Sequence, residues 1–338
     1  MREVNVGDQL DQYRLTELIA RSGMASIFKA VDELNGATVA IKIPYSQFES
    51  DVVFYSRFQR EEEVVRRLEH PNVIKVYTPR RKSRMYIAME YVEGVSLRAL
   101  MRDKRPLPID EALDYARQIC AALVYLHSNQ VVHRDLKPEN VLVTDGGRLK
   151  IMDFGIALDE TARRLTWSGL SSTIGTPDYM APEQVSGKRG DARTDIYALG
   201  TMLYEMLTAE LPYAAENVYN MMRAKTSEDP QRPTHYRPDL DPRLEEIVLH
   251  AIERIPRNRY DSAAEMLHDL DRPGEVVITD RAERLHPRSL AGQKIRRALW
   301  TVAFFGSLVG VLAFLIWLAN RYPASPQTSQ RSYRGQIK

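Results

Sequence analysis

The sequence predicts an α+β protein with two lobes, a small one rich in β-strands and a larger helical one, followed by a single transmembrane helix. Three observations predict this fold class. Short β-branched runs separated by turns fill residues 13–91, with one helical stretch among them. From Ser96 onward, apolar residues recur mainly with helical periodicity. Near the C-terminus, Leu299 to Ala319 run without a charged residue.

Length and composition restrict the class of protein. The 338 residues can form one large or two ordinary domains with a proper core. The net charge of +2 is nearly balanced, so nothing indicates a nucleic-acid partner. The single cysteine, Cys120, excludes an internal disulfide framework and any Cys-based zinc site. Residues 1–5 lack the apolar core of a signal peptide, so we expect the protein to start in the cytosol.

One helix is predicted in the small lobe, and it carries a buried charge. The residues that recur there at intervals of four and three, and so share one face, are Phe54, Phe58, Glu61, Val65 and Leu68. Glu61 therefore lies in an apolar stripe, where a carboxylate is costly unless it has a partner. Lys42, at the end of the strand VAIK, is the expected partner.

The larger lobe contains two short polar motifs close together. A helical stripe over residues 113–126 leads to the segment HRDLKPEN at 133–140. Two apolar runs joined by an Asp-Gly turn follow at 141–151, which indicates a hairpin. The triplet DFG comes next, at 153–155. Either motif alone would more often be a turn or a surface loop. Their order and short separation favour one functional unit.

These residues suit the transfer of a phosphoryl group from ATP. That reaction needs Mg²⁺ on the phosphates, and Asp153 and Asn140 offer the oxygen ligands that hard cations take. It also needs an aligned acceptor hydroxyl, whose proton a carboxylate such as Asp135 can accept. Lys137, two residues later, is placed to neutralise charge on the transferred group.

Taken together, the motifs resemble the protein kinase family, whose catalytic loop reads H-R-D-x-x-x-x-N and whose metal-binding turn reads D-F-G. With a lysine at position 137, the loop resembles that of serine/threonine kinases. The whole set of motifs resembles small bacterial (Hanks-type) membrane kinases. The resemblance extends to about residue 270. It implies a two-lobed protein kinase fold, with a small lobe at 13–91 and a larger lobe at 92–271, after an N-terminal segment at 1–12.

The resemblance also implies a catalytic set. Lys42, paired with Glu61, would hold the α- and β-phosphates of ATP, and Thr176 would bridge two residues of the catalytic loop. Mg²⁺, or Mn²⁺ in its place, would bind Asn140 and Asp153. The catalytic set implied in this way is Asp135, Lys137, Lys42, Glu61 and Thr176.

The nucleotide site implied by the resemblance departs from the family in one loop. Residues 19–27 stand where the family has three glycines over the phosphates, and small residues replace them beside one remaining glycine. Glycine lets backbone amides approach phosphate closely, so we expect a weaker clamp. The backbone of Glu90 and Val92 would bind adenine, and Met89 would guard the pocket behind it. The expected nucleotide-binding residues are Ala20, Ser22, Gly23, Ile27, Ala40, Lys42, Met89, Glu90, Val92, Asn140 and Asp153.

A hydroxyl-rich segment lies between the DFG triplet and Ala181-Pro182-Glu183. Because an arginine precedes the catalytic aspartate, and a guanidinium favours a phosphate partner, we expect autophosphorylation in this segment. The expected sites are Thr166 or Ser168, with Ser171 or Thr173 in addition. The family resemblance further implies that Asp195 holds the backbone of the catalytic loop and that Arg259 pairs with Glu183.

The C-terminal residues predict a membrane anchor. Residues 272–298 are charged and lack steady periodicity, which favours a juxtamembrane linker. Residues 299–319 are long enough, at about 1.5 Å per residue, to cross a hydrocarbon layer of roughly 30 Å. More Lys and Arg precede this span than follow it, which places the kinase domain in the cytoplasm and leaves 320–338 as a short extracytoplasmic tail. Gly306 and Gly310 form a G-x-x-x-G pair, which favours a homodimer for trans-autophosphorylation.

We therefore expect a single-pass protein of the cell inner membrane or plasma membrane that transfers the γ-phosphate of ATP to Ser/Thr of protein substrates in signal transduction. The sequence does not identify those substrates. Two alternatives stay open. A pseudokinase scaffold would keep the fold without transfer, which only the glycine-poor loop favours. A kinase fold that phosphorylates small molecules is the other, and the complete segment from 153 to 183 argues against it by family resemblance.

Overall fold

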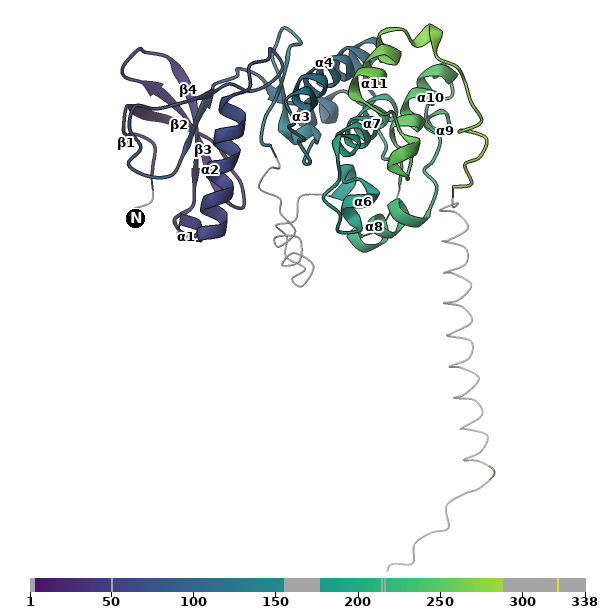
Figure 1. The fold of residues 1–338 in the computed structure, drawn as a ribbon, viewed down its shortest axis with the longest axis horizontal. Coiled ribbons are helices and arrows are strands. Elements are labelled where there is room, and N and C mark those ends of the chain that lie inside the picture. Colours follow the sequence, from purple (N-terminus) through teal and green to yellow (C-terminus); the bar gives the residue numbers. More distant parts are fainter. Residues whose placement is uncertain are drawn as a thin grey trace, which may run out of the picture. The chain divides into compact units, whose positions relative to one another are not determined.

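The computed structural model describes residues 4–49, 51–154, 177–213, 215, 217–287 and 321. Most strands lie in one lobe and most helices in the other, as predicted (Figure 1). The small lobe holds a six-stranded antiparallel sheet in the order β1-β2-β3-β4-β6-β5. Its elements are β1 (Gln9–Leu10), β2 (Tyr13–Arg21), β3 (Ala25–Asp32), β4 (Thr38–Pro44), α1 (Ser46–Glu49), α2 (Val52–Arg66), β5 (Val76–Tyr77) and β6 (Ile87–Glu90).

Helix α2 has the predicted buried face. Phe58 and Val65 lie in the core, and Glu61 is only 9% exposed between them. The helix ends at Arg66, before Leu68, the last residue of the predicted stripe. The amide of Leu68 instead donates to the carbonyl oxygen of Val65 at 3.0 Å, a tightened last turn that still buries the leucine. The apolar pattern therefore predicted the buried face correctly and the helix end slightly too late.

The larger lobe is built around α7 (Ala192–Thr208), whose residues are almost all buried. A helix that is apolar on all sides must be covered on all sides, and α4 and α10 pack against it. The three-stranded sheet β7-β8-β9 contains the predicted hairpin. The elements of this lobe are β7 (Val95–Ser96), α3 (Leu97–Asp103), α4 (Ile109–Ser128), η1 (Pro138–Asn140), β8 (Val141–Val143), β9 (Leu149–Ile151), η3 (Pro177–Tyr179), α6 (Pro182–Val185), α8 (Val218–Ser227), α9 (Pro233–Tyr236), α10 (Pro242–Ala251), η4 (Pro256–Asn258), α11 (Ala263–Asp271) and η5 (Pro273–Glu275).

Residues 272–287, expected to begin a linker, instead lie against the larger lobe. Thr279 donates from Oγ1 to the buried carboxylate of Glu246 at 2.7 Å, and Arg281 forms ion pairs with Glu246 and Glu253. Apolar side chains of the segment also pack on the core. The physical reason is that α10 buries a carboxylate that needs partners. We call residues 272–287 the C-terminal strap.

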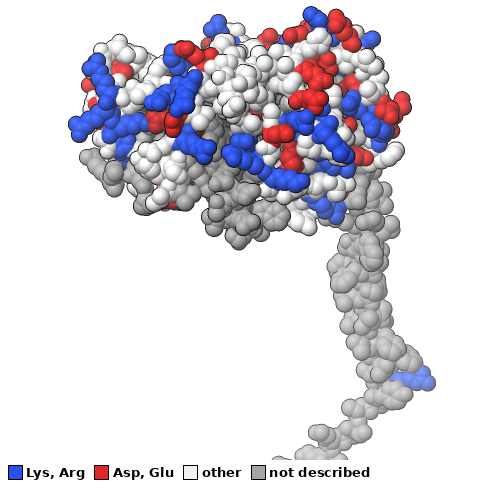
Figure 2. Space-filling model, in the orientation of Figure 1, with Lys and Arg blue, Asp and Glu red and all other residues white. Residues whose placement is uncertain are grey.

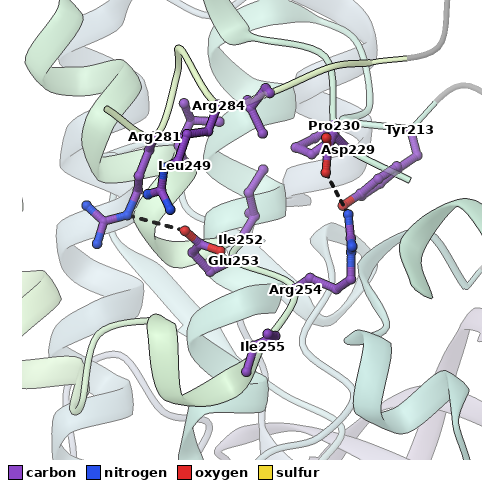
Figure 3. A pocket seen from close by; sticks show the side chains of 11 residues that line it. Tyr213, Asp229, Pro230, Leu249, Ile252, Glu253, Arg254, Ile255, Arg281 and Arg284 are labelled. Atoms are coloured by element: carbon purple, nitrogen blue, oxygen red, sulfur yellow. Dashed lines mark hydrogen bonds and ion pairs between the residues drawn. The ribbon is translucent and has the colours of Figure 1, made fainter. Parts of the chain in front are cut away.

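The strap closes one side of a pocket in the larger lobe (Figure 3). Arg281 and Arg284 contribute from the strap, while Tyr213 and Asp229 face them from the body of the lobe. The amide of His286, also in the strap, donates to Asp229 at 3.1 Å. The strap is therefore fastened at several points along its length.

The predicted membrane span, Leu299–Ala319, lies outside the described residues, as does the rest of the predicted linker from residue 288. Within the part of the chain that is described, none of the helices has the length and apolar character needed to cross a membrane. On the face shown in Figure 2, acidic and basic side chains are interspersed, consistent with the nearly balanced net charge.

We expect Gly200→Val to destabilise the protein. A Cβ atom at position 200 of α7 would lie 2.5 Å from the Cβ of Ala251 and 2.9 Å from Cγ2 of Ile252. Such overpacking costs about 1–3 kcal/mol, enough to lower the melting temperature by several degrees. Gly274→Val is the control, because nothing lies within 4 Å of the place that a Cβ atom would take at that residue. Equal melting temperatures for the two variants would contradict the close packing of α7 on the segment 251–252.

Candidate active site

The catalytic loop is held by one buried carboxylate. Asp195, in the first turn of α7 and 0% exposed, accepts hydrogen bonds from the backbone amides of His133 and Arg134, both at 2.8 Å. Arg134 has a φ of 64°, a conformation that L-residues rarely adopt without support. The expected contact of Asp195 is thus present. His127, which the sequence did not single out, adds a third contact, from Nε2 at 2.9 Å.

His133 joins the catalytic loop to the segment after β9. Its ring is fully buried, with Nε2 at 3.2 Å from the carbonyl oxygen of Met152 and the ring centroid 4.9 Å from that of Phe154. Burial lowers the pKa of His133 despite the nearby carboxylates. The histidine is therefore a neutral packing residue between the two motifs.

Three polar residues of the loop contact one another. Lys137 lies with Nζ 2.7 Å from Oδ2 of Asp135. The Asn140 amide donates to the backbone carbonyl of Asp135 at 2.8 Å and to its Oδ2 at 3.0 Å. Because the amide nitrogen of Asn140 points toward Asp135, its oxygen remains the atom suited to a metal. Thr176, expected to bridge this group, lies outside the described residues.

Lys42 connects the two lobes. From β4 its Nζ reaches Oδ1 of Asp153 at 2.8 Å and Oε1 of Glu61 at 3.7 Å. The contact with Glu61 that the sequence predicts is present, but the shorter contact is with Asp153. The ammonium thus lies between a carboxylate of α2 and one of the larger lobe.

Burial and charge oppose each other in this triad. Burial would lower the pKa of Lys42, but the charges of Asp153 and Glu61 outweigh it and raise that pKa. Burial likewise opposes ionisation of Asp153, and the charge of Lys42 reverses this, so its pKa is lowered. Burial raises the pKa of Glu61 to about 7, because Lys42 offsets it only in part and the charge of Asp153 adds to it. Glu61 is therefore the least firmly ionised of the three.

The glycine-poor loop forms a tight turn between β2 and β3. The Oγ atom of Ser22 accepts the amide of Ala25 at 3.1 Å and that of Met24 at 3.3 Å. The tyrosine hydroxyl of Tyr45 donates to the carbonyl of Ser22 at 3.0 Å. A serine at a position where the family has glycine therefore bonds amides of the kind that a phosphate would otherwise meet. The loss of glycine is evident from the sequence, but this closed turn is not. Ala20 and Gly23 are exposed here.

The strand and segment that join the lobes contain Glu90 and Val92, the residues expected to contact adenine. The amide of Glu90 donates to the carbonyl of Lys75 at 2.8 Å, and its carboxylate pairs with Lys150 at 2.8 Å. An adenine contact at Glu90 would therefore use its carbonyl oxygen. Val92 packs on the core next to this segment.

A small cavity borders Met89, the residue expected to guard the pocket behind the adenine site. Lys42, Glu61, Ile74 and Phe154 line it together with Met89. Ala40 is buried in β4, and Ile27 pairs with Lys42 across β3 and β4. The expected nucleotide-binding residues of β3, β4 and β6 are thus neighbours in the sheet.

The two expected metal ligands fit a magnesium ion. Asn140 and Asp153 supply one amide and one carboxylate, and Mg²⁺ usually takes one or two carboxylates and completes its shell with phosphate and water. The described residues contain no group of three or more His, Cys, Asp and Glu side chains that could hold a metal alone. One amide and one carboxylate leave positions in the metal shell that phosphate oxygens and water would fill.

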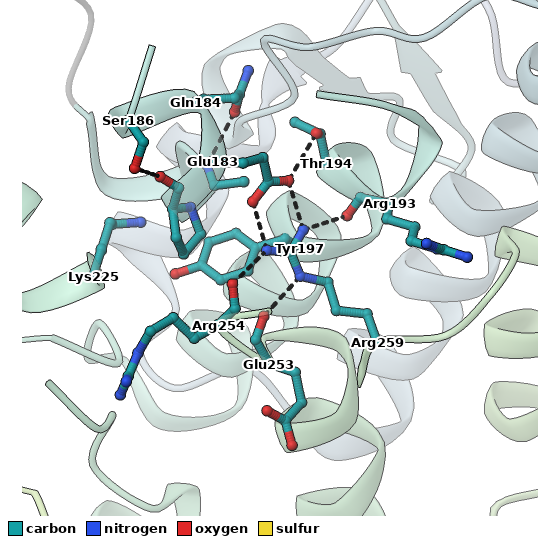
Figure 4. Close-up of polar contacts among 12 residues, drawn as sticks. Glu183, Gln184, Ser186, Arg193, Thr194, Tyr197, Lys225, Glu253, Arg254 and Arg259 are labelled. Atoms are coloured by element: carbon teal, nitrogen blue, oxygen red, sulfur yellow. Dashed lines mark hydrogen bonds and ion pairs between the residues drawn. The ribbon is translucent and has the colours of Figure 1, made fainter. Parts of the chain in front are cut away.

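A second polar cluster fixes α6 (Figure 4). Arg259 donates to both carboxylate oxygens of Glu183, at 2.8 and 2.7 Å, and its side chain is 0% exposed. The Thr194 hydroxyl donates to the same carboxylate at 3.0 Å. Burial opposes the charge of Glu183, but the bonds from Arg259 prevail and lower its pKa. The next residue, Gln184, donates to the carbonyl of Arg134 at 3.0 Å. The pairing implied by the sequence is present, and it ties α6 to the catalytic loop.

A further polar network, which the sequence did not predict, lies beside the catalytic loop. Arg98 of α3 pairs with Glu139 at 2.8 Å and with Glu205 at 2.7 Å. The hydroxyl of Tyr179 bonds both Arg98 and Glu205. Because the four residues lie on four separate elements, no local sequence spacing predicts that they contact one another. The network links the catalytic loop, through Glu139, with η3.

Comparison with known proteins places this fold and site in one family. The family model described as Protein kinase domain matches residues 13–270. The serine/threonine-protein kinase PknB of Mycolicibacterium smegmatis is 37% identical over 278 residues, covering 80% of this chain and 44% of PknB. The probable serine/threonine-protein kinase SCO3848 of Streptomyces coelicolor is 37% identical over 265 residues, or 77% of this chain and 39% of that protein.

Among solved structures, the PknI kinase domain of Mycobacterium tuberculosis aligns with a TM-score of 0.65 and 27% identity, over 81% of this chain and all of that domain. The chain therefore belongs to the protein kinase family. It spans less than half the length of the curated relatives it matches.

We expect Glu183→Gln to cost about 3–5 kcal/mol at neutral pH, because it leaves Arg259 buried without its carboxylate. The pKa of Glu183 is lowered from the ordinary 4.5, so its contribution is complete above that value and is lost as the pH falls through the folded-state pKa. Urea denaturation should therefore show a gap between wild type and variant that narrows below about pH 4.5.

Asp261→Asn is the matched control. It removes an exposed ion pair with Arg193, with an N–O distance of 2.8 Å and the aspartate side chain 80% exposed. Such pairs contribute less than about 1 kcal/mol. Equal losses for the two variants would contradict the importance of burial at Glu183.

Proposed function

We propose that the chain is a serine/threonine protein kinase that transfers the γ-phosphate of ATP to hydroxyl groups of proteins. One observation supports this most strongly. Lys42 of β4 pairs with Asp153, and Asn140 bonds Asp135 within the catalytic loop. The amide of Met152, next to Asp153, donates to the carbonyl oxygen of Asn140 at 2.9 Å, so the two pairs belong to one site. A binding scaffold would not need these charged groups to contact one another, so their arrangement favours phosphoryl transfer over the pseudokinase alternative.

Each residue has a role that its geometry supports. Lys42, oriented by Asp153 and Glu61, offers a fixed cation to the phosphates. Asp135, oriented by Lys137 and Asn140, can accept the proton of the attacking hydroxyl. Lys137 then stabilises charge on the transferred group. Asn140 and Asp153 would hold a Mg²⁺ ion, or Mn²⁺ in its place, which would neutralise charge on the phosphates. Such fixed charges accelerate transfer mainly by positioning and electrostatics.

We expect Asp135→Asn to reduce transfer at least about 100-fold, because the general base is lost while the charge of Lys42 remains. The full chain in detergent is given ATP labelled at the γ-phosphate, with histone as a generic acceptor, and label is measured on both proteins. Asp145→Asn, in the exposed hairpin turn, is the control and should keep full activity. Thermal shift with Mg-ATP shows whether each variant still binds nucleotide.

Label that persists in the Asp135 variant would exclude this mechanism. Wild-type protein that binds ATP but transfers no label would favour the scaffold, with the closed Ser22 turn as its cause. Mapping the label on the chain itself tests the proposed autophosphorylation at Thr166 or Ser168, with Ser171 or Thr173. These hydroxyls lie outside the described residues, and the support for them is the arginine beside Asp135 in the catalytic loop.

We further propose that residues 299–319 anchor the enzyme in the cell inner membrane or plasma membrane, with the kinase domain in the cytoplasm. The uncharged run and the basic residues before it support this. A homodimer through Gly306 and Gly310 would bring two chains together for trans-autophosphorylation and signal transduction.

We expect truncation after Pro287 to move the protein from the membrane to the soluble fraction, because the strap is kept and only residues 288–338 are lost. Flotation of lysates on a density gradient measures this. The control carries Ala→Ser substitutions at positions 303, 313 and 319, which leave the span uncharged and should not change flotation. Truncated protein that still floats with membranes would contradict the anchor.

A further inference from the structure

Lys225 is a lysine buried inside the larger lobe. It lies in the last turn of α8 and is 1% exposed. Its Nζ donates to the backbone carbonyl oxygens of Asp178 and of Met180, the latter at 3.0 Å. The same atom lies 5.1 Å from the ring centroid of Tyr197, and Figure 4 shows the two side chains in the cluster around Glu183.

Burying this ammonium is costly. Its described hydrogen bonds go to carbonyl oxygens rather than to a carboxylate, and burial lowers the pKa of Lys225 to about 7. The carboxylate of Asp178 offsets this in part, while the charge of Arg259 adds to it. An apolar side chain of similar length would fill the same space at lower cost. The lysine therefore contributes something that packing alone does not, namely bonds to the backbone at 178 and 180.

The backbone that Lys225 holds is linked to the catalytic loop in two ways. η3 (Pro177–Tyr179) comes directly before α6, and α6 is bonded to the carbonyl of Arg134 through Gln184. On its other side, the hydroxyl of Tyr179 bonds Arg98, which pairs with Glu139 of the catalytic loop. The segment 177–180 is thus connected to the loop that carries Asp135 through the Tyr179 hydroxyl and, by way of α6, through Gln184.

We propose that Lys225 is a positioning residue for the protein acceptor. By bonding two carbonyls of the segment 177–180, it holds that segment in the conformation that lets an acceptor hydroxyl reach Asp135. This inference rests on the proposed kinase activity. It assigns to Lys225 an effect on binding of the protein acceptor and none on binding of the nucleotide.

The test is Lys225→Met in the full chain, assayed in detergent with labelled ATP and histone. We expect the KM for histone to rise at least about tenfold, because the variant loses both charge-assisted hydrogen bonds to the segment 177–180. The KM for ATP and the hydrolysis of ATP without acceptor should not change. Arg223→Met is the matched control, since Arg223 lies on the same helix, is 54% exposed and pairs only with Glu228 among the described ion pairs. It should leave all three quantities unchanged.

A second variant, Lys225→Gln, keeps a shorter donor and should give an intermediate KM for histone. Thermal melting shows whether both variants fold. An unchanged KM for histone would overturn the inference, and so would a uniform loss of acceptor transfer, ATP hydrolysis and melting temperature in both variants, which indicates a structural role only. Wild-type protein that labels neither histone nor itself would refute the proposed function, and this inference with it. Failure of the inference alone differs from this result, because the wild-type protein is then active.

Discussion

The buried carboxylate of Asp195 is the group on which the geometry of the site depends. It binds two consecutive amides of the catalytic loop and His127 at once. Arg134 keeps its unfavourable backbone conformation only while these bonds persist. The other contacts of the site depend on the conformation of that loop. Within it Asn140 donates to Asp135, and the carbonyl oxygen of Arg134 accepts a hydrogen bond from Gln184 of α6. Because α7 is enclosed on all sides by other helices, Asp195 cannot move without disturbing the core.

The triad of Lys42, Asp153 and Glu61 shows a different use of buried charge. Lys42 and Asp153 stabilise each other's ionised forms, whereas burial leaves the pKa of Glu61 near 7. The three groups belong to β4, to α2 and to the segment after β9. The attraction of Lys42 for both carboxylates therefore helps to set how the two lobes meet at the site, and α2 is held by the longer of the two contacts.

Local patterns predicted what depends on local spacing. The stripe on α2 identified Glu61 among three consecutive glutamates, and the short motifs located the loop and the hairpin. Contacts between distant segments had no such signal. Arg98 meets Glu205 across more than a hundred residues, and the strap binds Glu246 on α10 because that carboxylate is buried, which the sequence of the strap does not reveal. The Ser22 turn escaped prediction because a hydroxyl can bond its own backbone without altering any periodicity.

The strap also determines how far the domain can reach. If residues 299–319 span the membrane as proposed, a free linker over 272–298 would allow about 95 Å of extended chain, but residues 288–298 alone allow about 40 Å. A tether that short would keep the catalytic loop close to the bilayer. Acceptors held at the same surface would then meet the enzyme at a raised effective concentration, and proteins in bulk solution would not. Selection of substrates by location would in this way be built into the attachment of a segment far from the catalytic residues.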